Sequence, residues 1–161
     1  LVTDNAFKKL MGVYNGVRLG FLSQTMGITQ AAFDRTMEHV KQRKQFGKEI
    51  CEFQGLQWMI SDMYVQLEAA RTILYRAAQA ASDNKPDKNA VSVAKIFVAE
   101  AAQKITDTCI QLHGGYGYSK QYPLEWYYRC VRAASIAGGT LQVHKTMLAS
   151  SVLERKFDQR N

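Results

Sequence analysis

Residues 94–118 read AKIFVAEAAQKITDTCIQLHGGYGY, and this stretch decides the fold. It predicts a long helix, because its small and apolar side chains recur every three or four positions and therefore share one helix face. Those positions are Ala94, Phe97, Ala101, Ile105, Cys109 and Leu112. The glycines within residues 113–118 then predict a loop that ends the helix, because glycine weakens a helix interior and suits its C-terminal cap.

The same spacing recurs upstream, over residues 22–40 and residues 56–77, and predicts two further long helices. Phe46–Gly47 is expected to end the first of them. Residues 82–87, SDNKPD, predict the turn that separates the second from the third. Pro86 or Asp87 suits the start of the third helix, since both residue types favour a helix N-terminus.

The C-terminal part predicts shorter helices. One is expected over residues 124–133, directly after Pro123, and Gly138–Gly139 breaks it. Thr140 is then a suitable N-cap for a last helix that runs to about Lys156. No run alternates with a period of two, so a sheet is not expected. The predicted fold is all-α, an up-and-down four-helix-type bundle with an extra C-terminal helix, in one domain over residues 1–161.

Length and composition agree with one globular domain. The chain has 161 residues, of which 47% are hydrophobic and 22% charged, and these values exclude a disordered tail or a collagen-like rod. The net charge of +7 favours anionic partners, but the basic residues are scattered and do not alternate with aromatic ones as in a nucleic-acid track. Residues 1–10 lack the apolar core of a signal peptide. A first residue other than Met is expected of a processed chain or of a piece of a longer one.

Cysteine and histidine give no sign of a disulfide or a metal site. Cys51, Cys109 and Cys130 are far apart, odd in number and outside any CxxC motif, which is typical of free thiols in a reducing compartment. The three histidines share no metal-ligand spacing with one another or with the cysteines, so no metal is expected.

Two glycine-bearing junctions are candidates for binding a phosphate. Glycines in residues 111–117 let backbone N–H groups approach a phosphate without a side-chain clash. Residues 138–142, GGTLQ, lie at the start of a helix, where free N–H donors and the helix dipole suit an anion. Arg43 beside Phe46–Gly47 adds a guanidinium next to an aromatic ring, which suits a pyrophosphate and a flat heterocycle. Each pattern alone is more often a plain helix end or turn.

In this order the motifs resemble the C-terminal helical domain of the acyl-CoA dehydrogenase flavoprotein family. The resemblance extends from about Phe7 to Leu153 without evident gaps. Its motifs are RKQFGK at 43–48, Phe53–Gln54, QLHGGYGY at 111–118, Tyr122–Pro123, Arg129 and Gly139–Thr140. Family members also have an N-terminal helical domain and a middle β domain, which this chain lacks. The resemblance therefore implies a fragment or an excised domain with little activity alone.

The resemblance also implies an FAD site that is shared between subunits. Arg43 and Gln54 would contact the FAD of a neighbouring subunit, with Phe46 against it. The adenine-side pyrophosphate would lie, also across the interface, in a cradle made by Gln111, Leu112, His113, Gly114 and Gly115. Thr140 and Gln142 would reach FAD from their own subunit.

On the substrate side, the resemblance places Asn15 and Arg18 at the acyl-CoA thioester pocket and Gly139 near the acyl chain. The small residues Ala137 and Gly138 leave room for a branched or cyclic acid. The implied partners are an acyl-CoA, an electron-transfer flavoprotein or similar acceptor, and further subunits in a homo-oligomer (a dimer of dimers, thus a homotetramer) or a mixed oligomer. The expected location is the cytoplasm, or the mitochondrial matrix in a eukaryote. Neither nucleic-acid binding nor a membrane span is expected.

One part of the family pattern is missing. The family reaction removes a proton from the α carbon of the acyl group and passes a hydride from the β carbon to the flavin, so a carboxylate base must lie within hydrogen-bond reach. The usual Glu positions of this domain hold Val17 and Gly138 here, and neither side chain can accept a proton. Cys130 also replaces the usual aspartate after Arg129. The catalytic base is therefore unknown.

Several readings follow from this gap. The first is oxidation of the α,β C–C bond of an acyl-CoA, with a carboxylate from the missing N-terminal portion as the base. We favour this interpretation over the others. The second is flavin-assisted chemistry without α-proton abstraction, as in a relative that removes sulfite from a sulfinated acyl-CoA. The third is a non-catalytic partner or assembly module that completes the FAD site of another subunit. A degenerate member without activity is a fourth. His144, just after Gln142, is expected at the surface or at the flavin edge.

Overall fold

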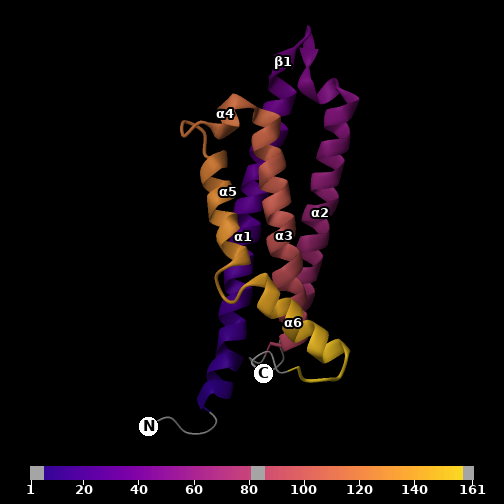
Figure 1. The fold of residues 1–161 in the computed structure, drawn as a ribbon. Helices are drawn as coiled ribbons and strands as arrows, with labels where there is room; N and C mark the ends of the chain where they lie inside the picture. Colours follow the sequence, from indigo (N-terminus) through magenta and orange to yellow (C-terminus); the bar gives the residue numbers. More distant parts are fainter. Residues whose placement is uncertain (1–5, 81–85, 158–161) are drawn as a thin grey trace.

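The computed structural model describes residues 6–80 and 86–157, which form helices around one central helix (Figure 1). The elements in chain order are α1 (Ala6–Gln42), β1 (Lys44–Gln45), β2 (Lys48–Glu49), η1 (Ile50–Glu52), α2 (Gln54–Gln79), α3 (Lys88–His113), α4 (Gly115–Tyr118), α5 (Leu124–Arg132), η2 (Ala133–Ser135) and α6 (Leu141–Val152). This architecture confirms the all-α bundle that the apolar periodicity predicts.

Helix α3 is the centre of the bundle, since it packs against α1, α2, α5 and α6. Its predicted apolar face is buried except for Phe97, which is half-buried. Leu22 of α1 and Leu67 of α2 pack into the same core and are 0% and 1% exposed. Full burial of a leucine contributes about 1.5–3 kcal/mol, so each of these side chains stabilises the bundle substantially.

Local chemistry starts two helices at the predicted residues. The carboxylate of Asp87 accepts hydrogen bonds from the backbone N–H groups of Asn89 and Ala90, at 3.1 and 3.3 Å, and so caps α3. The hydroxyl of Thr140 accepts from the N–H of Val143 at 3.4 Å and caps α6. Of the predicted turn at 82–87, residues 82–85 lie outside the described residues.

The first helix is longer than its apolar pattern indicates. Gly12, Gly16 and Gly20 all lie inside α1, although each glycine costs about 1 kcal/mol relative to alanine in a helix interior. A Cβ added at any of them would meet nothing within 4 Å. The glycine stripe therefore faces no neighbour among the described residues.

Three further details differ from the sequence expectations. A short hairpin, β1–β2, follows α1, and strands of two residues are too short to show an alternating pattern. The glycine-rich loop includes the four-residue helix α4, Gly115–Tyr118. Helix α6 ends at Val152 rather than near Lys156, and the positive φ of Glu154, 51°, follows this end.

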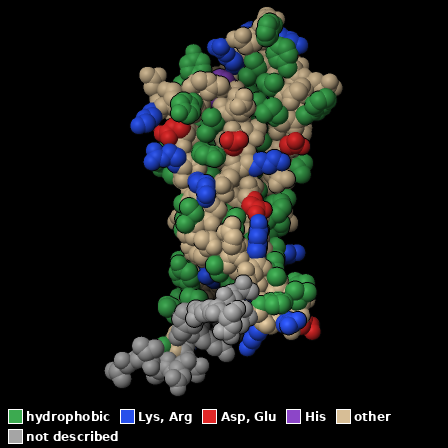
Figure 2. Space-filling model, in the orientation of Figure 1, with side chains coloured by type: hydrophobic (Ala, Val, Ile, Leu, Met, Phe, Trp, Pro, Cys, Tyr) green, Lys and Arg blue, Asp and Glu red, His purple; other side chains and the backbone are tan. Residues whose placement is uncertain are grey.

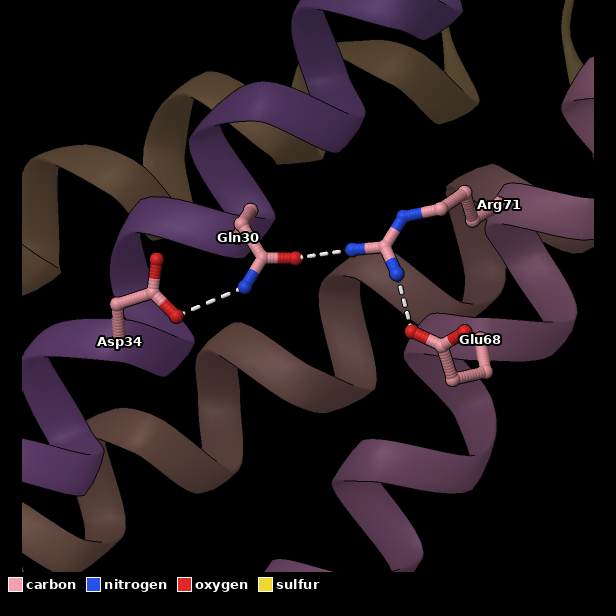
Figure 3. Close-up of polar contacts among 4 residues, drawn as sticks. All are labelled: Gln30, Asp34, Glu68 and Arg71. Carbon is pink, nitrogen blue, oxygen red and sulfur yellow. Dashed lines mark hydrogen bonds and ion pairs between the residues drawn. The ribbon is translucent and has the colours of Figure 1, made fainter.

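The surface carries dispersed charge. Figure 2 shows lysine and arginine side chains scattered over one face of the molecule rather than gathered in a single patch. Figure 3 shows a polar chain that ties α1 to α2: Arg71 donates to Glu68 and to Gln30, and Gln30 donates to Asp34 at 2.8 Å. None of the described helices combines the length and the apolar character that crossing a bilayer requires.

Candidate functional site

The predicted cofactor and substrate residues fall in two places on the bundle (Figure 1). One place, here called the hairpin end, comprises residues 43–54 and 111–118, and Figure 1 shows its elements β1 and α4 at the same end of the molecule. The other, here called the glycine turn, comprises residues 137–140 between η2 and α6. It lies toward the opposite end, beside α1 and α3.

The tip of the hairpin has an unusual backbone. Lys44 pairs with Glu49 and Gln45 with Lys48, so Phe46 and Gly47 form a loop of two residues with φ values of 54° and 81°. Loops of this kind favour Asn-Gly, because a bulky residue with positive φ is strained by about 1–2 kcal/mol. The Phe46 side chain is 93% exposed. Its ring makes an edge-to-face contact with Phe53, with the ring centroids 6.2 Å apart, but the side chain is otherwise open to solvent. A strained aromatic residue with so little burial is a functional signal.

Arg43 links the hairpin to residues 111–118 through a contact with Tyr116. Its guanidinium carbon lies 5.9 Å from the centre of the Tyr116 ring, in a cation–π contact. Gln54, at the first position of α2, is exposed. The structure therefore brings Arg43 together with Tyr116, whereas Gln54 has no hydrogen bond to residues 111–118 among the described residues.

Gly114 and Gly115 are open to contact. Gly114 ends α3 with a φ of 59°, Gly115 begins α4, and a Cβ at either residue would meet nothing within 4 Å. Gly117 differs, because its Cβ would lie 2.7 Å from the carbonyl oxygen of Ile110. Open glycines beside an arginine suit a phosphate, whereas Gly117 is required by packing.

The side chains of Leu112 and His113 face the protein interior. Leu112 joins the hydrophobic core, and the His113 ring stacks on His39 with centroids 4.1 Å apart. Nδ1 of His113 lies 2.8 Å from the carbonyl oxygen of Cys109. Burial lowers the pKa of His113, and of His39 with a further contribution from His113 and Arg43. Any cofactor contact at 112 and 113 would therefore come from the backbone.

Arg18 binds the glycine turn. Its Nε donates to the carbonyl oxygen of Gly138 at 2.7 Å, and its Nη1 donates to Oδ1 of Asn15 at 2.7 Å. The structure thus brings the three predicted substrate residues Asn15, Arg18 and Gly139 to one place. Gly138 and Gly139 have φ values of 74° and 100°, which favour glycine.

Lys95 is a residue of this site that the sequence analysis missed. It lies in α3, is 1% exposed, and its ammonium donates to the carbonyl oxygens of Ala134 and Ala137. Burial, and to a lesser degree Arg18, lowers its pKa from 10.5 to about 8. One signal could have found it: Lys95 follows Val91 by four positions and precedes Val98 by three, so it lies on the apolar face of α3.

From the sequence, His144 is expected at the surface or at the flavin edge, and the structure contradicts the first of these two places. It is 0% exposed, its Nδ1 lies 3.1 Å from Oγ of Ser92, and its Nε2 lies 3.4 Å from the carbonyl oxygen of Gly138. Burial lowers its pKa, and the charges of Arg18 and Lys95 act in the same direction. His144 lies on the face of α6 that packs against α3, and this packing explains why it is buried.

A hollow of about 400 Å³ opens beside the start of α6. Its lining residues are Glu100, Gln103, Arg132, Ser135, Ile136, Thr140, Leu141 and Gln142. It contains both residues predicted to reach FAD from their own subunit, together with Arg132, which sequence reasoning did not single out. The N-terminus of α6, capped by Thr140, adds free backbone N–H groups to this hollow.

Neither usual base position supplies a carboxylate. Val17 is 58% exposed on α1, and Gly138 has no side chain. Within the described residues, the ion pairs are Arg71–Glu68, Arg129–Glu125 and Lys145–Glu100, so no described acidic side chain pairs with Arg18 or Lys95. The glycine turn is therefore a positively charged place without an acid of its own.

Comparison with known proteins identifies the family of the chain. The family model for the acyl-CoA dehydrogenase C-terminal domain matches residues 7–153. The chain therefore belongs to the acyl-CoA dehydrogenase family, whose members are flavoproteins, and corresponds to their C-terminal domain.

Individual relatives differ in their activities. A 3-sulfinopropanoyl-CoA desulfinase of Paraburkholderia xenovorans is 44% identical over 98% of this chain and 40% of its own length. A subunit of the caffeyl-CoA reductase–Etf complex of Acetobacterium woodii is 38% identical over 94% of this chain and 40% of its own length. The structure of butyryl-CoA dehydrogenase from Megasphaera elsdenii matches with a TM-score of 0.90 and 35% identity, over 94% of this chain and 40% of that one. The chain thus spans about 40% of the length of these relatives.

Proposed function

We propose that this chain is the FAD-binding and subunit-contact domain of a flavoenzyme that acts on acyl-CoA thioesters. The observation that carries the proposal is the outward presentation of the hairpin end: Phe46 is 93% exposed on a strained backbone, beside Arg43 and two open glycines. These groups suit a dinucleotide, because they combine a flat ring, a guanidinium and accessible backbone N–H groups.

The residues present fit FAD at two places, the hairpin end and the hollow beside the start of α6. At the hairpin end, Arg43 and the backbone of Gly114–Gly115 would hold phosphate oxygens of a cofactor bound mainly by a neighbouring subunit. At the hollow beside α6, Thr140 and Gln142 would hydrogen-bond the cofactor of the same subunit, with Arg132 nearby as a cation. FAD would supply a two-electron acceptor beside the acyl chain. Asn15 and Arg18 would line the pocket that takes the acyl group beside the thioester.

Oxidation of the α,β C–C bond is the reaction that the resemblance implies, and the likeness to butyryl-CoA dehydrogenase supports it. This reaction needs a base, and Val17 and Gly138 cannot serve. We therefore propose that the carboxylate comes from a part of the protein outside residues 1–161. The electron acceptor would be an electron-transfer flavoprotein, as the name of the Etf-complex relative suggests. A homotetramer or mixed oligomer in the cytoplasm or mitochondrial matrix completes the proposal.

A second candidate is removal of a sulfinate group from an acyl-CoA. It is favoured by the carboxylate-free glycine turn and by the 44% identity to a 3-sulfinopropanoyl-CoA desulfinase. The third candidate, a non-catalytic module for the FAD site of a partner subunit, would use the hairpin end alone.

The full-length protein allows a direct test. We expect it to be yellow, to lose FAD when Arg43→Gln is introduced, and to keep FAD in the control Lys41→Gln, whose side chain is exposed at the same end of α1. Activity is measured as dye reduction with butyryl-CoA and as sulfite release from 3-sulfinopropanoyl-CoA, and these two assays separate the first two candidates. A colourless protein whose melting temperature does not respond to added FAD contradicts the proposal.

A further inference from the structure

The space beside the glycine turn is bordered by nitrogen atoms from three helices. A Cβ at Gly138 would lie 3.5 Å from Cγ of Arg18 and 3.8 Å from Nζ of Lys95. A Cβ at Gly139 would lie 3.5 Å from Nη2 of Arg18 and 3.2 Å from Nε2 of His144. The two glycines therefore leave free the positions of two side chains, and the walls around those positions are cationic or can form hydrogen bonds.

The positive charge at this place is not balanced within the described chain. Arg18 is 8% exposed and Lys95 1%, and no described acidic side chain forms an ion pair with either. Buried charges are costly unless they are paired or hydrogen-bonded. The backbone carbonyls of Ala134, Ala137 and Gly138 satisfy part of this demand, but they carry no formal charge.

Arg18 also keeps one end of its guanidinium free. Nε binds Gly138 and Nη1 binds Asn15, whereas Nη2 makes no hydrogen bond to any described residue and lies alongside Gly139. A guanidinium held in this way is preorganised to donate to an anionic oxygen group. Lys95 is turned toward Ala134 and Ala137, so it contributes charge rather than direct contact.

We propose that Arg18, supported by Lys95 and the glycine turn, forms a subsite for an anionic group on the acyl chain, either a carboxylate or a sulfinate. The substrate is then an acyl-CoA whose short chain ends in a negative charge. This inference rests on the proposed action on acyl-CoA thioesters. The absence of side chains at 138 and 139 gives such a group the room to approach Nη2.

Binding of matched acyl-CoA probes to the full-length FAD-bound protein tests the subsite. Succinyl-CoA and 3-sulfinopropanoyl-CoA carry the charge, and 4-methylpentanoyl-CoA has the shape of succinyl-CoA without it. Because hydrogen bonds to charged groups are the stronger ones, we expect calorimetric titration to give a Kd about tenfold lower for both anionic probes than for the neutral one. The tighter of the two anionic probes identifies which group the subsite favours.

Two pairs of variants separate charge from shape. Gly138→Asp and Gly138→Asn introduce side chains of equal size that tolerate the positive φ of 74°, but only Asp neutralises the site. Both side chains fill the room beside Nη2, so we expect them to weaken the binding of all three probes. Only Gly138→Asp should also abolish the ratio of affinities that favours the anionic probes, and Gly138→Asn should retain that ratio. Arg18→Gln should abolish the preference, whereas Arg18→Lys should keep part of it.

The outcomes distinguish this inference from the proposed function. Equal affinity of the wild-type protein for charged and neutral probes overturns the subsite alone, and indicates that a carboxylate from another part of the protein neutralises Arg18. An equal loss of preference in Gly138→Asp and Gly138→Asn overturns it as well, since charge would then not matter. Failure of all three acyl-CoAs to bind overturns the proposed function, and the subsite with it.

Discussion

The hairpin end and the glycine turn use similar groups, an arginine beside glycines, in opposite surroundings. At the hairpin end the groups face outward, and the rings of Phe46 and Tyr118 are 93% and 83% exposed. At the glycine turn, Lys95 and His144 are almost inaccessible and lie against backbone carbonyls. The difference shows that the glycine turn is held in place by hydrogen bonds within this chain, although the charge of Arg18 stays unbalanced there, whereas the groups of the hairpin end face away from the described residues.

The largest effect is expected from Lys95→Met, which removes the cation from the glycine turn at nearly constant volume. The carbonyl groups of Ala134 and Ala137 would lose their donor inside the protein, so we expect the free energy of unfolding to fall by about 3 kcal/mol in urea denaturation at neutral pH. The control is Lys145→Met, because Lys145 is exposed and pairs with Glu100 at the surface, where an ion pair contributes about 1 kcal/mol or less. Equal losses would mean that the buried hydrogen bonds of Lys95 do not hold the glycine turn in place.

The same variant has a pH signature. The lowered pKa of Lys95, about 8 against 10.5, means that the unfolded chain binds more protons than the folded one between these values. The contribution of Lys95 to the free energy of unfolding therefore rises with pH across that window. The difference in stability between the wild-type protein and Lys95→Met should widen from about pH 8 upward. A constant difference would show that the ammonium is not desolvated.

A pair of glycine substitutions sharpens the comparison within the hairpin end. Gly117→Ala places a Cβ 2.7 Å from the carbonyl oxygen of Ile110, and we expect overpacking to cost about 2 kcal/mol of stability. Gly115→Ala meets nothing within 4 Å, so stability should be unchanged while FAD affinity falls. Thermal melting of the FAD-free protein and FAD titration measure the two effects. If Gly115→Ala lowers the melting temperature as much as Gly117→Ala does, the space beside Gly115 is not free for a Cβ.

The smallest effect, and the one with the opposite sign, is expected from Phe46→Asn. Asparagine tolerates the φ of 54° better than phenylalanine does, so the free energy of unfolding should rise by about 1 kcal/mol. FAD retention and subunit association should weaken at the same time, because the exposed ring is lost. If Phe46→Asn instead lowers the free energy of unfolding of the FAD-free protein, the Phe46 side chain stabilises the fold.

Features that depend on neighbouring residues could be predicted from the sequence. The helix face of α3, the cap at Asp87 and the cap at Thr140 follow from spacing and residue type alone. The motifs of the hairpin end are short runs of consecutive residues, so they can be recognised in the sequence, and their order along the chain gives the family resemblance. Arg43 and Tyr116 meet because their segments end at the same end of the bundle.

The surroundings of the glycine turn could not be predicted, because they come from segments far apart in the chain. Lys95 reaches Ala137 across 42 positions, and His144 reaches Ser92 across 52. The place of Lys95 on the apolar face of α3 could indicate that it is buried, but not which carbonyl groups it would meet. A histidine shortly after a helix start suggests an exposed residue when only its own element is considered. The packing of α3 against α6 buries both of them.

The hydrogen bond between Arg18 and Gly138 joins positions 120 residues apart. During synthesis on the ribosome, the first helix therefore emerges long before its partner exists. Contacts between residues so far apart in the chain form after the local helices. The guanidinium of Arg18 therefore stays in contact with water until residues near Gly138 have been synthesised. The chemistry assigned to this arginine can begin only when translation of the domain is nearly complete.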